Sequence, residues 1–199
     1  METDTQRRPR PTEQSTTISR ENRTIVTDET IFLGNICTAD KANQQPWPFV
    51  AVSDERTKMR IRVAAEREEE LLYRERAGEE YLDAIRPIGT NWIKPHLTDA
   101  PYLIAVFEQP WRLEDGEKRK HYYVRESVGI AVGFLLSALH DAGLATLTHA
   151  PSPMGFLNDI LERPSHERPF ILVPVGYPAP SAEVPRLSKK TLDAIATFV

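Results

Sequence analysis

The sequence predicts a layered fold of the α/β or α+β class, because segments with helical periodicity alternate with short apolar segments typical of strands. Residues 102–107 (YLIAVF) form a near-continuous apolar run, as a central strand buried on both faces requires. Residues 128–139 contain no charged side chain, so a helix there has no polar face for water. We therefore expect a sheet with a buried central helix packed against it.

The central helix is expected within residues 127–143 (SVGIAVGFLLSALHDAG). Its apolar run follows Arg125 and Glu126 and is shorter than the roughly 20 residues that a bilayer span requires. Gly129 and Gly133 share one helical face, where we expect another element to pack closely. A helix that is apolar all round needs more cover than one chain of this size readily supplies, which predicts a homodimer with this helix in its interface.

The N-terminal part is expected to comprise a disordered tail at residues 1–14 and the beginning of a single domain over 15–199. Thr27 or Asp28 caps a short apolar helix. After the proline-rich stretch that follows, residues 48–52 (PFVAV) have the pattern of a short buried strand.

A long charged helix is expected next, capped by residues 53–54 (SD) and extending over 55–76. We interpret most of its many charges as a solvated surface with glutamate–arginine pairs one turn apart. A second helical segment follows over 78–88. Residues 90–97 (TNWIKPHL) show neither helical nor strand periodicity, which suggests a loop that closes over a pocket, in a lid spanning about 69–98.

The second half of the chain continues the alternation. Residues 111–121 (WRLEDGEKRKH) are expected to form a polar loop before the central helix. A third strand is predicted at 145–148, a helix at 154–162 and a fourth strand at 170–175.

Composition excludes several functional classes. The 199 residues fit one domain with a proper core. With 25 Lys+Arg against 29 Asp+Glu, a net charge of −4 and no basic stripe, neither nucleic acid nor a membrane surface is an expected partner. Cys37 is the single cysteine, which precludes an intrachain disulfide and favours a reducing cytoplasm. The five histidines lack ligand spacing, so no metal site is expected. The N-terminus lacks the apolar core of a secretion signal.

Six segments carry a resemblance to a known family: ANQQPWPFVAV (42–52), EEELLY (68–73), the segment at 89–107, the segment at 121–155, RPSHERPFILVPVGYP (163–178) and VPRLSKKTLD (184–193). In this order they resemble the nitroreductase superfamily, and within it the iodotyrosine deiodinase branch. The resemblance covers most of the chain after residue 26. It implies an α+β fold with a nitroreductase-like central sheet flanked by helices, a domain-sharing homodimer, and FMN at the dimer interface.

The resemblance also implies a substrate lid that grips the amino and carboxyl groups of a tyrosine derivative. Glu69, Tyr73 and Lys94 match its three side chains, and Ala42 matches a backbone contact to the phenolic oxygen. Glu69 and Tyr73 are one turn apart on a helix, so both can point toward an ammonium group, while Lys94 can meet a carboxylate. The structural alternative is that Glu69 pairs with an arginine and Lys94 is simply exposed. The intact spacing and the NWIK context favour the ligand-binding interpretation.

The cofactor positions differ from the family pattern. An arginine-rich run that clasps the FMN phosphate in the family falls here, aligned on residues 26–29, on a run without arginine: Ser15, Thr16, Thr17, Ile18 and Ser19. Phosphate strongly favours bidentate arginine partners, and hydroxyl groups do not neutralise its charge. Arg20, Arg23 or the arginines in residues 7–10 are candidates to replace them. We therefore expect weaker FMN binding than in typical relatives.

Three other cofactor positions are changed as well. Asp40 stands where a flavin-binding serine is usual, and Lys189 replaces an arginine near the C-terminus. In the strip formed by Thr148, His149 and Ala150, the alanine replaces a threonine whose hydroxyl meets the flavin N5 in the family, a bond associated there with one-electron steps and dehalogenation.

Two functional hypotheses follow from the resemblance. The first is an FMN-dependent oxidoreductase of the deiodinase and nitroreductase type that reduces a halotyrosine or related aromatic amino acid with electrons from NAD(P)H or a reductase. The flavin would carry the redox chemistry, so no catalytic side chain is assigned. The second is a protein that has lost the usual FMN binding and serves as an aromatic-amino-acid binding protein or as an enzyme with another cofactor.

Overall fold

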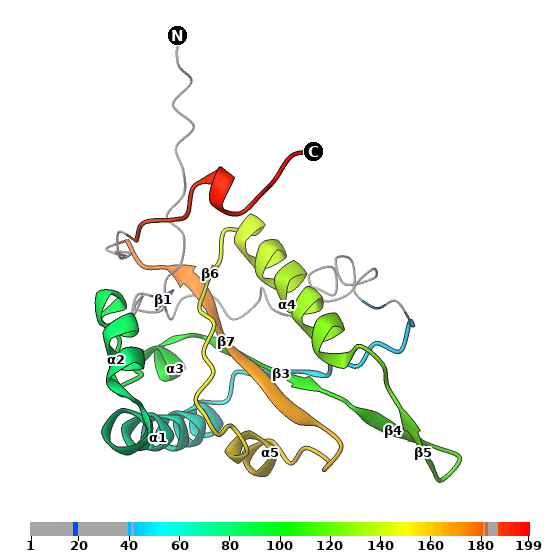
Figure 1. Cartoon of the computed structure of the whole chain (residues 1–199). Helices are drawn as coiled ribbons and strands as arrows, with labels where there is room; N and C mark the ends of the chain where they lie inside the picture. The colour runs from blue at the N-terminus through cyan, green and yellow to red at the C-terminus, as the bar shows by residue number, and fades with distance from the viewer. Residues whose placement is uncertain (1–17, 20–39, 41, 181, 183–186) are drawn as a thin grey trace.

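The fold is built on one antiparallel sheet with helices on both faces (Figure 1). The computed structural model describes residues 18–19, 40, 42–180, 182 and 187–199. Four strands follow the order β1-β7-β3-β2, and β6 pairs with β7. The strands are β1 (Ile18–Ser19), β2 (Phe49–Val52), β3 (Tyr102–Glu108), β6 (Ala145–Thr146) and β7 (Arg168–Pro178). Every pairing in this sheet is antiparallel, which makes the fold α+β.

The pairing of β3 with β7 forms the centre of the sheet, from Tyr102 opposite Val175 to Glu108 opposite Arg168. The five inner residues of β3 are buried, as the apolar run at 102–107 predicted. Alternate β3 side chains enter two separate clusters on the two faces of the sheet. A central strand buried on both faces is therefore confirmed.

Helices cover the two faces unequally. α1 (Glu55–Leu71), α3 (His96–Asp99) and α5 (Phe156–Ile160) supply side chains to one apolar cluster, and α4 (Val124–Asp141) supplies the other. Figure 1 shows α4 on the opposite side of the sheet from α1 and α5. The other helical elements of the described residues are the π-helix η3 (Leu72–Arg76), α2 (Glu79–Ile85), and the short 3-10 helices η4 (Arg86–Ile88) and η5 (Leu192–Ala194).

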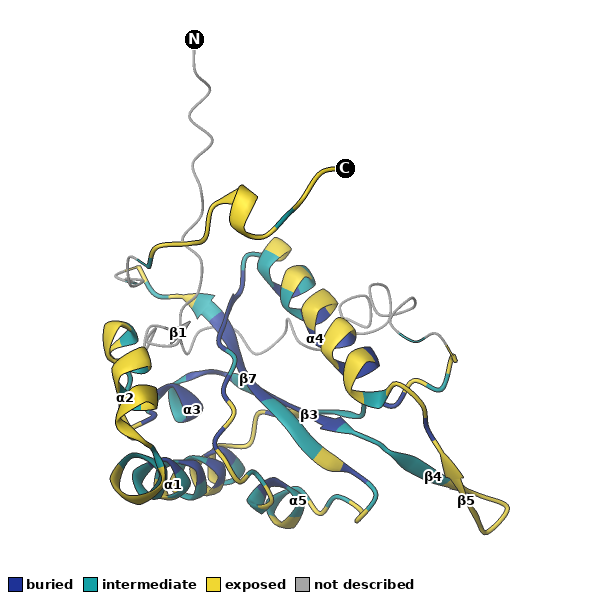
Figure 2. Cartoon of the chain, viewed as in Figure 1, coloured by how far each residue is buried: buried dark blue, intermediate teal, exposed yellow. Residues whose placement is uncertain are grey.

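Among the described residues, the central helix is covered on its sheet-facing side (Figure 2). Val128 and Leu135 pack against the sheet, whereas Ile130 and Phe134 are 49% and 40% exposed. The described part of the chain does not supply the expected close packing at Gly129 and Gly133, because a Cβ added at either glycine would meet nothing within 4 Å. The uncharged run does form a long helix on the sheet, and packing of a second copy on its open face stays a prediction.

The expected polar loop at 111–121 is instead a β-hairpin, made of β4 (Trp111–Glu114) and β5 (Glu117–Lys120). Asp115 and Gly116 join the strands with φ angles of 53° and 79°. An Asp-Gly pair with positive φ at both residues is a strong two-residue hairpin signal. β5 contains only charged residues and β4 alternates over just four residues, which explains why the sequence pattern suggested a loop.

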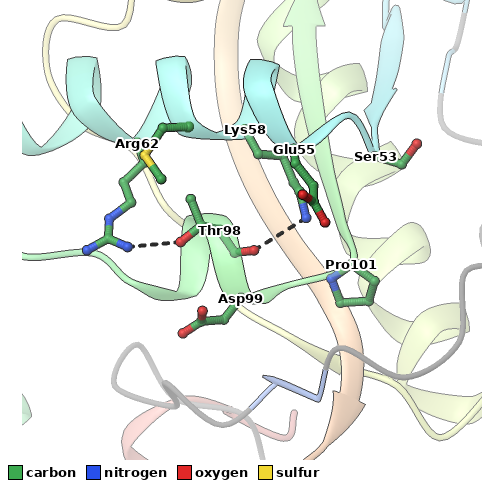
Figure 3. A pocket seen from close by; sticks show the side chains of 8 residues that line it. Ser53, Glu55, Lys58, Arg62, Thr98, Asp99 and Pro101 are labelled. Carbon is green, nitrogen blue, oxygen red and sulfur yellow. Dashed lines mark hydrogen bonds between the residues drawn. The ribbon is translucent and has the colours of Figure 1, made fainter.

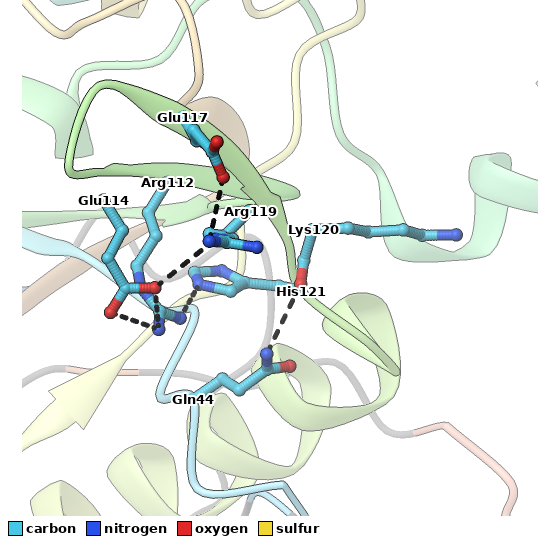
Figure 4. A network of polar contacts seen from close by, with 7 residues as sticks. All are labelled: Gln44, Arg112, Glu114, Glu117, Arg119, Lys120 and His121. Carbon is cyan, nitrogen blue, oxygen red and sulfur yellow. Dashed lines mark hydrogen bonds and ion pairs between the residues drawn. The ribbon is translucent and has the colours of Figure 1, made fainter.

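Polar contacts tie the base of this hairpin to the rest of the chain (Figure 4). The Nδ1 atom of buried His121 lies 2.6 Å from the carbonyl of Gln109, and Arg112 Nη1 lies 3.0 Å from its Nε2. Because a guanidinium can only donate, His121 carries its proton on Nδ1 and accepts at Nε2. The amide of Gln44 donates to the Lys120 carbonyl at 3.4 Å, which links the segment before β2 to the hairpin.

Most other predicted elements are confirmed with shifted ends. The helix predicted at 55–76 is α1 followed by η3, and the segment 90–97 leads into the short helix α3. β6 and α5 are shorter than predicted and β7 is longer. The predicted helix after Thr27 and the tail at 1–14 lie outside the described residues.

Two histidines lie in the core between α3 and the segment after β6. His96 and His149 are 3% and 6% exposed, their ring centroids are 5.6 Å apart, and neither Nε2 atom has a hydrogen-bond partner among the described residues. Burial, reinforced by the positive charge of Lys94, lowers the pKa of His96 to about 4 and that of His149 to about 3. Both imidazoles are therefore neutral near pH 7.

We expect this pair to make the fold sensitive to acid. In the unfolded chain these histidines have a pKa of about 6.5, so below that pH they bind protons that the folded chain excludes. Their contribution to the free energy of unfolding is therefore complete above about pH 6.5 and decreases as the pH falls toward the folded-state pKa values. Between about pH 6.5 and about pH 5, each histidine should remove about 2 kcal/mol from the free energy of unfolding. Urea unfolding over that range measures the free energy of unfolding at each pH. Its pH dependence should be weaker in His96→Gln and in His149→Gln than in the parent, and the control His140→Gln should show the same pH dependence as the parent.

Candidate functional site

One cavity of about 240 Å³ gathers residues from distant parts of the chain. Its walls come from the end of α1, from η3 and α2, from the segment before α3, and from the strip that follows β6. Six residues predicted from the sequence line it: Glu69, Tyr73, Lys94, Thr148, His149 and Ala150. The structure therefore brings the predicted lid side chains and the predicted cofactor strip to one place.

Helix α1 carries the first two of these residues to the cavity. The helix begins at Asp54, whose Oδ2 accepts the Thr57 N–H at 2.7 Å. It widens into η3 just beyond Glu69, and the Ala77 N–H donates to the Leu72 carbonyl at 2.8 Å, a π-type bond. Such π-turns occur frequently at functional sites. Here the turn carries Tyr73 and the end of the lid helix.

An aromatic contact holds the outer side of this turn. The Tyr73 ring meets the edge of Trp92 at a centroid distance of 6.2 Å, and the guanidinium of Arg74 lies 5.6 Å from the centre of the Trp92 ring. An edge-to-face arrangement is a favourable geometry for two rings. The contact joins η3 to the segment that also contains Lys94.

Glu69 and Lys94 form a buried ion pair inside the cavity. Lys94 Nζ lies 3.3 Å from Glu69 Oε2 and donates to Thr90 Oγ1 at 2.9 Å. The two side chains are only 10% and 7% exposed. The alternative of a glutamate paired with arginine beside an exposed lysine is thus wrong. Burying two charges removes much of their hydration, so such a pair contributes little net stability and is weak support for a purely structural role.

The strip at residues 148–150 is fixed by the sheet. The His149 N–H donates to the Leu172 carbonyl at 2.8 Å, and the Leu172 N–H donates back at 2.9 Å. Thr148 is half-buried, His149 is buried and Ala150 is exposed, and all three line the cavity. The strip therefore presents a hydroxyl, an imidazole and a small side chain to the same cavity.

Three other predicted residues do not line this cavity. Ala42 and Lys189 are exposed. The carboxylate of Asp40 closes its own turn, because its two oxygens accept the N–H groups of Ala42 at 3.0 Å and Gln45 at 2.6 Å. Of the predicted phosphate run, Ser15, Thr16 and Thr17 lie outside the described residues, while Ile18 and Ser19 form β1.

Sequence reasoning missed a row of polar residues on α1 that holds the segment carrying Lys94 (Figure 3). Lys58 Nζ donates to the Ala100 carbonyl at 2.7 Å, and Arg62 Nη1 donates to Thr98 Oγ1 at 2.9 Å. The Glu66 Oε1 atom accepts the backbone N–H of Lys94 at 2.7 Å. These α1 charges are not the solvated surface that the sequence suggested, since Lys58 is 5% exposed. Their four-residue spacing was the available signal.

The described residues contain neither a cluster suited to a metal ion nor a helix suited to a bilayer. No group of three or more His, Cys, Asp or Glu side chains is arranged to hold a metal ion. Among the described helices, none has the length and apolar character needed to cross a bilayer.

Comparison with known proteins places the chain in a family. A model of the Nitroreductase family matches residues 37–177. The iodotyrosine deiodinase of Haliscomenobacter hydrossis is 57% identical over 155 residues, covering 77% of this chain and 70% of that protein. The iodotyrosine deiodinase of Hydra vulgaris is 44% identical over 156 residues, covering 77% of this chain but 57% of the relative, so the chain spans little more than half of that protein.

A solved structure agrees with these sequence relatives. The crystal structure of oxidized iodotyrosine deiodinase bound to FMN and 3-iodo-L-tyrosine matches with a TM-score of 0.72 and 30% identity, over 95% of this chain and 96% of that chain. The family match covers well over half of the chain, and the bacterial relative shares more than half of its aligned residues. This chain therefore belongs to the nitroreductase family, in the branch of the iodotyrosine deiodinases.

Proposed function

We propose that this protein is an FMN-dependent oxidoreductase that reductively removes halogen from a halotyrosine or acts on a related aromatic amino acid. The observation that carries the proposal is the buried Glu69–Lys94 pair, which faces the same cavity as the strip at residues 148–150. The 57% identity to a bacterial iodotyrosine deiodinase supports the same reaction class. So does the likeness to a deiodinase structure that holds FMN and 3-iodo-L-tyrosine.

The lid charges match an amino-acid zwitterion. In the structure Glu69 and Lys94 neutralise each other at 3.3 Å. A substrate ammonium beside Glu69 and a substrate carboxylate beside Lys94 would replace this one pair by two, so neither buried charge is left unpaired. Tyr73 joins Glu69 on the ammonium side. We propose that the segment at about 69–98 acts as the lid that closes over the bound amino acid.

The strip beside the cavity fits a flavin in its chemistry. Thr148 offers a hydroxyl, Ala150 leaves the strip open, and the buried Nε2 of His149 has no partner among the described residues, as at a site that a bound group completes. We propose that residues 148–150 contact FMN and that Lys189 and the run at 15–19 serve its phosphate. When bound, FMN supplies two electrons that, with one proton, replace the carbon–halogen bond by a carbon–hydrogen bond and release halide. NAD(P)H or a reductase is the proposed source of these electrons, in the cytoplasm.

The exposed face of α4 supports a homodimer. Ile130 and Phe134 are large apolar side chains exposed on that face, beside Gly129 and Gly133, which offer a smooth surface. The same face turned toward a second copy would bury these residues in an isologous contact. We propose that this contact places elements of one subunit beside the site of the other.

The first experiment asks whether FMN binds. We expect the purified protein to show an absorbance band near the visible flavin maximum that denaturation releases, with weaker affinity than in typical relatives. Arginines at Ser15, Thr16 and Ser19 should strengthen binding by about 10-fold or more per contact made, because each charge-assisted phosphate contact contributes about 1.5–3 kcal/mol.

Three arginines placed at Thr3, Thr5 and Thr12 serve as the control for added charge. Titration of FMN fluorescence compares the two variants with the parent. If neither the parent nor either variant binds FMN, the proposal of an FMN-dependent oxidoreductase is contradicted. An aromatic-amino-acid binding protein is then the better description. Nanomolar binding by the parent would show that the run at 15–19 was wrongly aligned with the phosphate site.

A second experiment separates the lid from the cofactor. Lys94→Ala and Glu69→Gln should each weaken binding of a halotyrosine by about 1.5–3 kcal/mol, because each removes one charged hydrogen bond. The corresponding halophenol, which lacks amino and carboxyl groups, should bind weakly to the parent and to both variants alike. Calorimetry with both ligands measures this, and FMN affinity without substrate is the control. Equal binding of phenol and amino acid by the parent would contradict the role of the lid.

A third experiment tests the homodimer. A Cβ at Gly133 would meet nothing within 4 Å, so Gly133→Leu adds bulk to the open face of α4 and should leave the fold intact while weakening the dimer. Sedimentation should show a dimer for the parent and a shift toward the 22.6 kDa monomer for the variant. Val63→Glu, at an exposed apolar residue on α1, is the matched control and should remain dimeric. A parent that is monomeric at micromolar concentration would overturn the assignment.

A further inference from the structure

One row of side chains on helix α1 contacts the segment 94–100, which precedes β3. Lys58, Arg62 and Glu66 follow each other at four-residue spacing, and Glu69 continues the same face. Each of the four contacts the segment 94–100, either at its backbone or at a side chain. The stripe therefore fixes the segment that presents Lys94 to the cavity.

Lys94 is held at two separate points. Its backbone N–H donates to Glu66 Oε1 at 2.7 Å, whereas its ammonium contacts Glu69 and Thr90. The ammonium contacts must change when a carboxylate binds, since Lys94 Nζ then turns toward the ligand. The backbone bond to Glu66 does not need to change. Glu66 is absent from the cavity lining, so it touches Lys94 without facing the ligand.

Glu66 is itself held in place. The same Oε1 atom accepts from Arg62 Nε at 2.7 Å, and the other end of that guanidinium bonds Thr98 Oγ1 at 2.9 Å. Arg62 and Glu66 are each about a quarter exposed, so their bond is partly shielded from water. A charge-assisted bond from a carboxylate to a backbone N–H is stronger than a neutral one. The backbone of Lys94 is thus anchored to α1 independently of its side chain.

We infer that Glu66 is a positioning residue that fixes the backbone of Lys94, so that the lysine ammonium can pass from Glu69 to a ligand carboxylate while the segment stays in place. The inference rests on the proposed function for the identity of its ligand. Glu66 adds no contact to the bound molecule. Its effect is that less of the lid has to be ordered when the ligand binds.

The test compares Glu66→Ala with Glu66→Gln, which retains an oxygen that can accept the Lys94 N–H. We expect Glu66→Ala to weaken binding of 3-iodotyrosine by about 10-fold or more, and to raise KM with little change in kcat. Binding of 2-iodophenol should change less than about 2-fold, and Glu66→Gln should recover most of the loss. Glu70→Ala, which removes an exposed pair with Arg74 on the same helix, is the control and should behave as the parent.

Hydrogen exchange of the Lys94 amide without ligand provides a second readout. Protection in the parent and in Glu66→Gln, lost in Glu66→Ala, is the expected result. Three outcomes would overturn this inference and leave the proposed function standing. They are equal protection of the amide in all three proteins, equal binding of 3-iodotyrosine by the parent and Glu66→Ala, and an equal loss of binding of both ligands in Glu66→Ala. A parent that protects this amide but binds no 3-iodotyrosine would instead overturn the proposed function, and with it the role of Glu66 in binding.

Discussion

The pairing of β3 with β7 is the constraint on which the rest of the structure depends. Both faces of this pair are apolar, so helices must cover both sides, and α1 and α4 take opposite faces. β7 also fixes the strip at 148–150 through the bridge between His149 and Leu172. The lid segment ends where β3 begins. Two walls of the cavity are therefore attached to the same rigid pair of strands.

Charged side chains on α1 then position the segment 94–100, which contributes a third wall of the cavity. The helix must bury Ile61 and Ala65 against the sheet, and this orientation carries the neighbouring polar stripe toward the segment 94–100. A buried charge without a partner is strongly unfavourable, so each side chain of the stripe is paired with a carbonyl, a hydroxyl or an N–H. The Glu69–Lys94 pair completes this row at the cavity. Packing and electrostatics thus fix the segment 94–100 against α1.

Sequence reasoning recovered what depends on periodicity and local chemistry. The buried strand at 102–107 and the long helix after Asp54 follow from an apolar run and a cap. The convergence of Glu69 with Lys94 was expected only from the family resemblance, since the residues alone favoured a glutamate paired with an arginine and an exposed lysine. The hairpin at Asp115 and Gly116 was missed because β5 is charged on both sides, β4 is only four residues long, and the turn carries the main signal. The exposed face of α4 agrees with the expectation that one chain does not cover this helix on every side. The sequence could not show which face is exposed, because an uncharged helix has no polar stripe to mark it. Long-range partners of charged residues, such as Glu66, are decided by tertiary packing that the sequence pattern does not contain.

Asp40 shows how the structure satisfies a charge that raises a question when only the sequence is considered. The family resemblance implies that this aspartate stands where a flavin-binding serine is usual, which predicts a negative charge near the expected flavin. In the structure both carboxylate oxygens accept backbone N–H groups of the same turn, from Ala42 and Gln45. Such bonds satisfy the carboxylate locally and stabilise the turn, as short polar side chains commonly do. Asp40 therefore has a structural role of its own, and the proposed binding of FMN depends on the run at 15–19 and on the strip at 148–150.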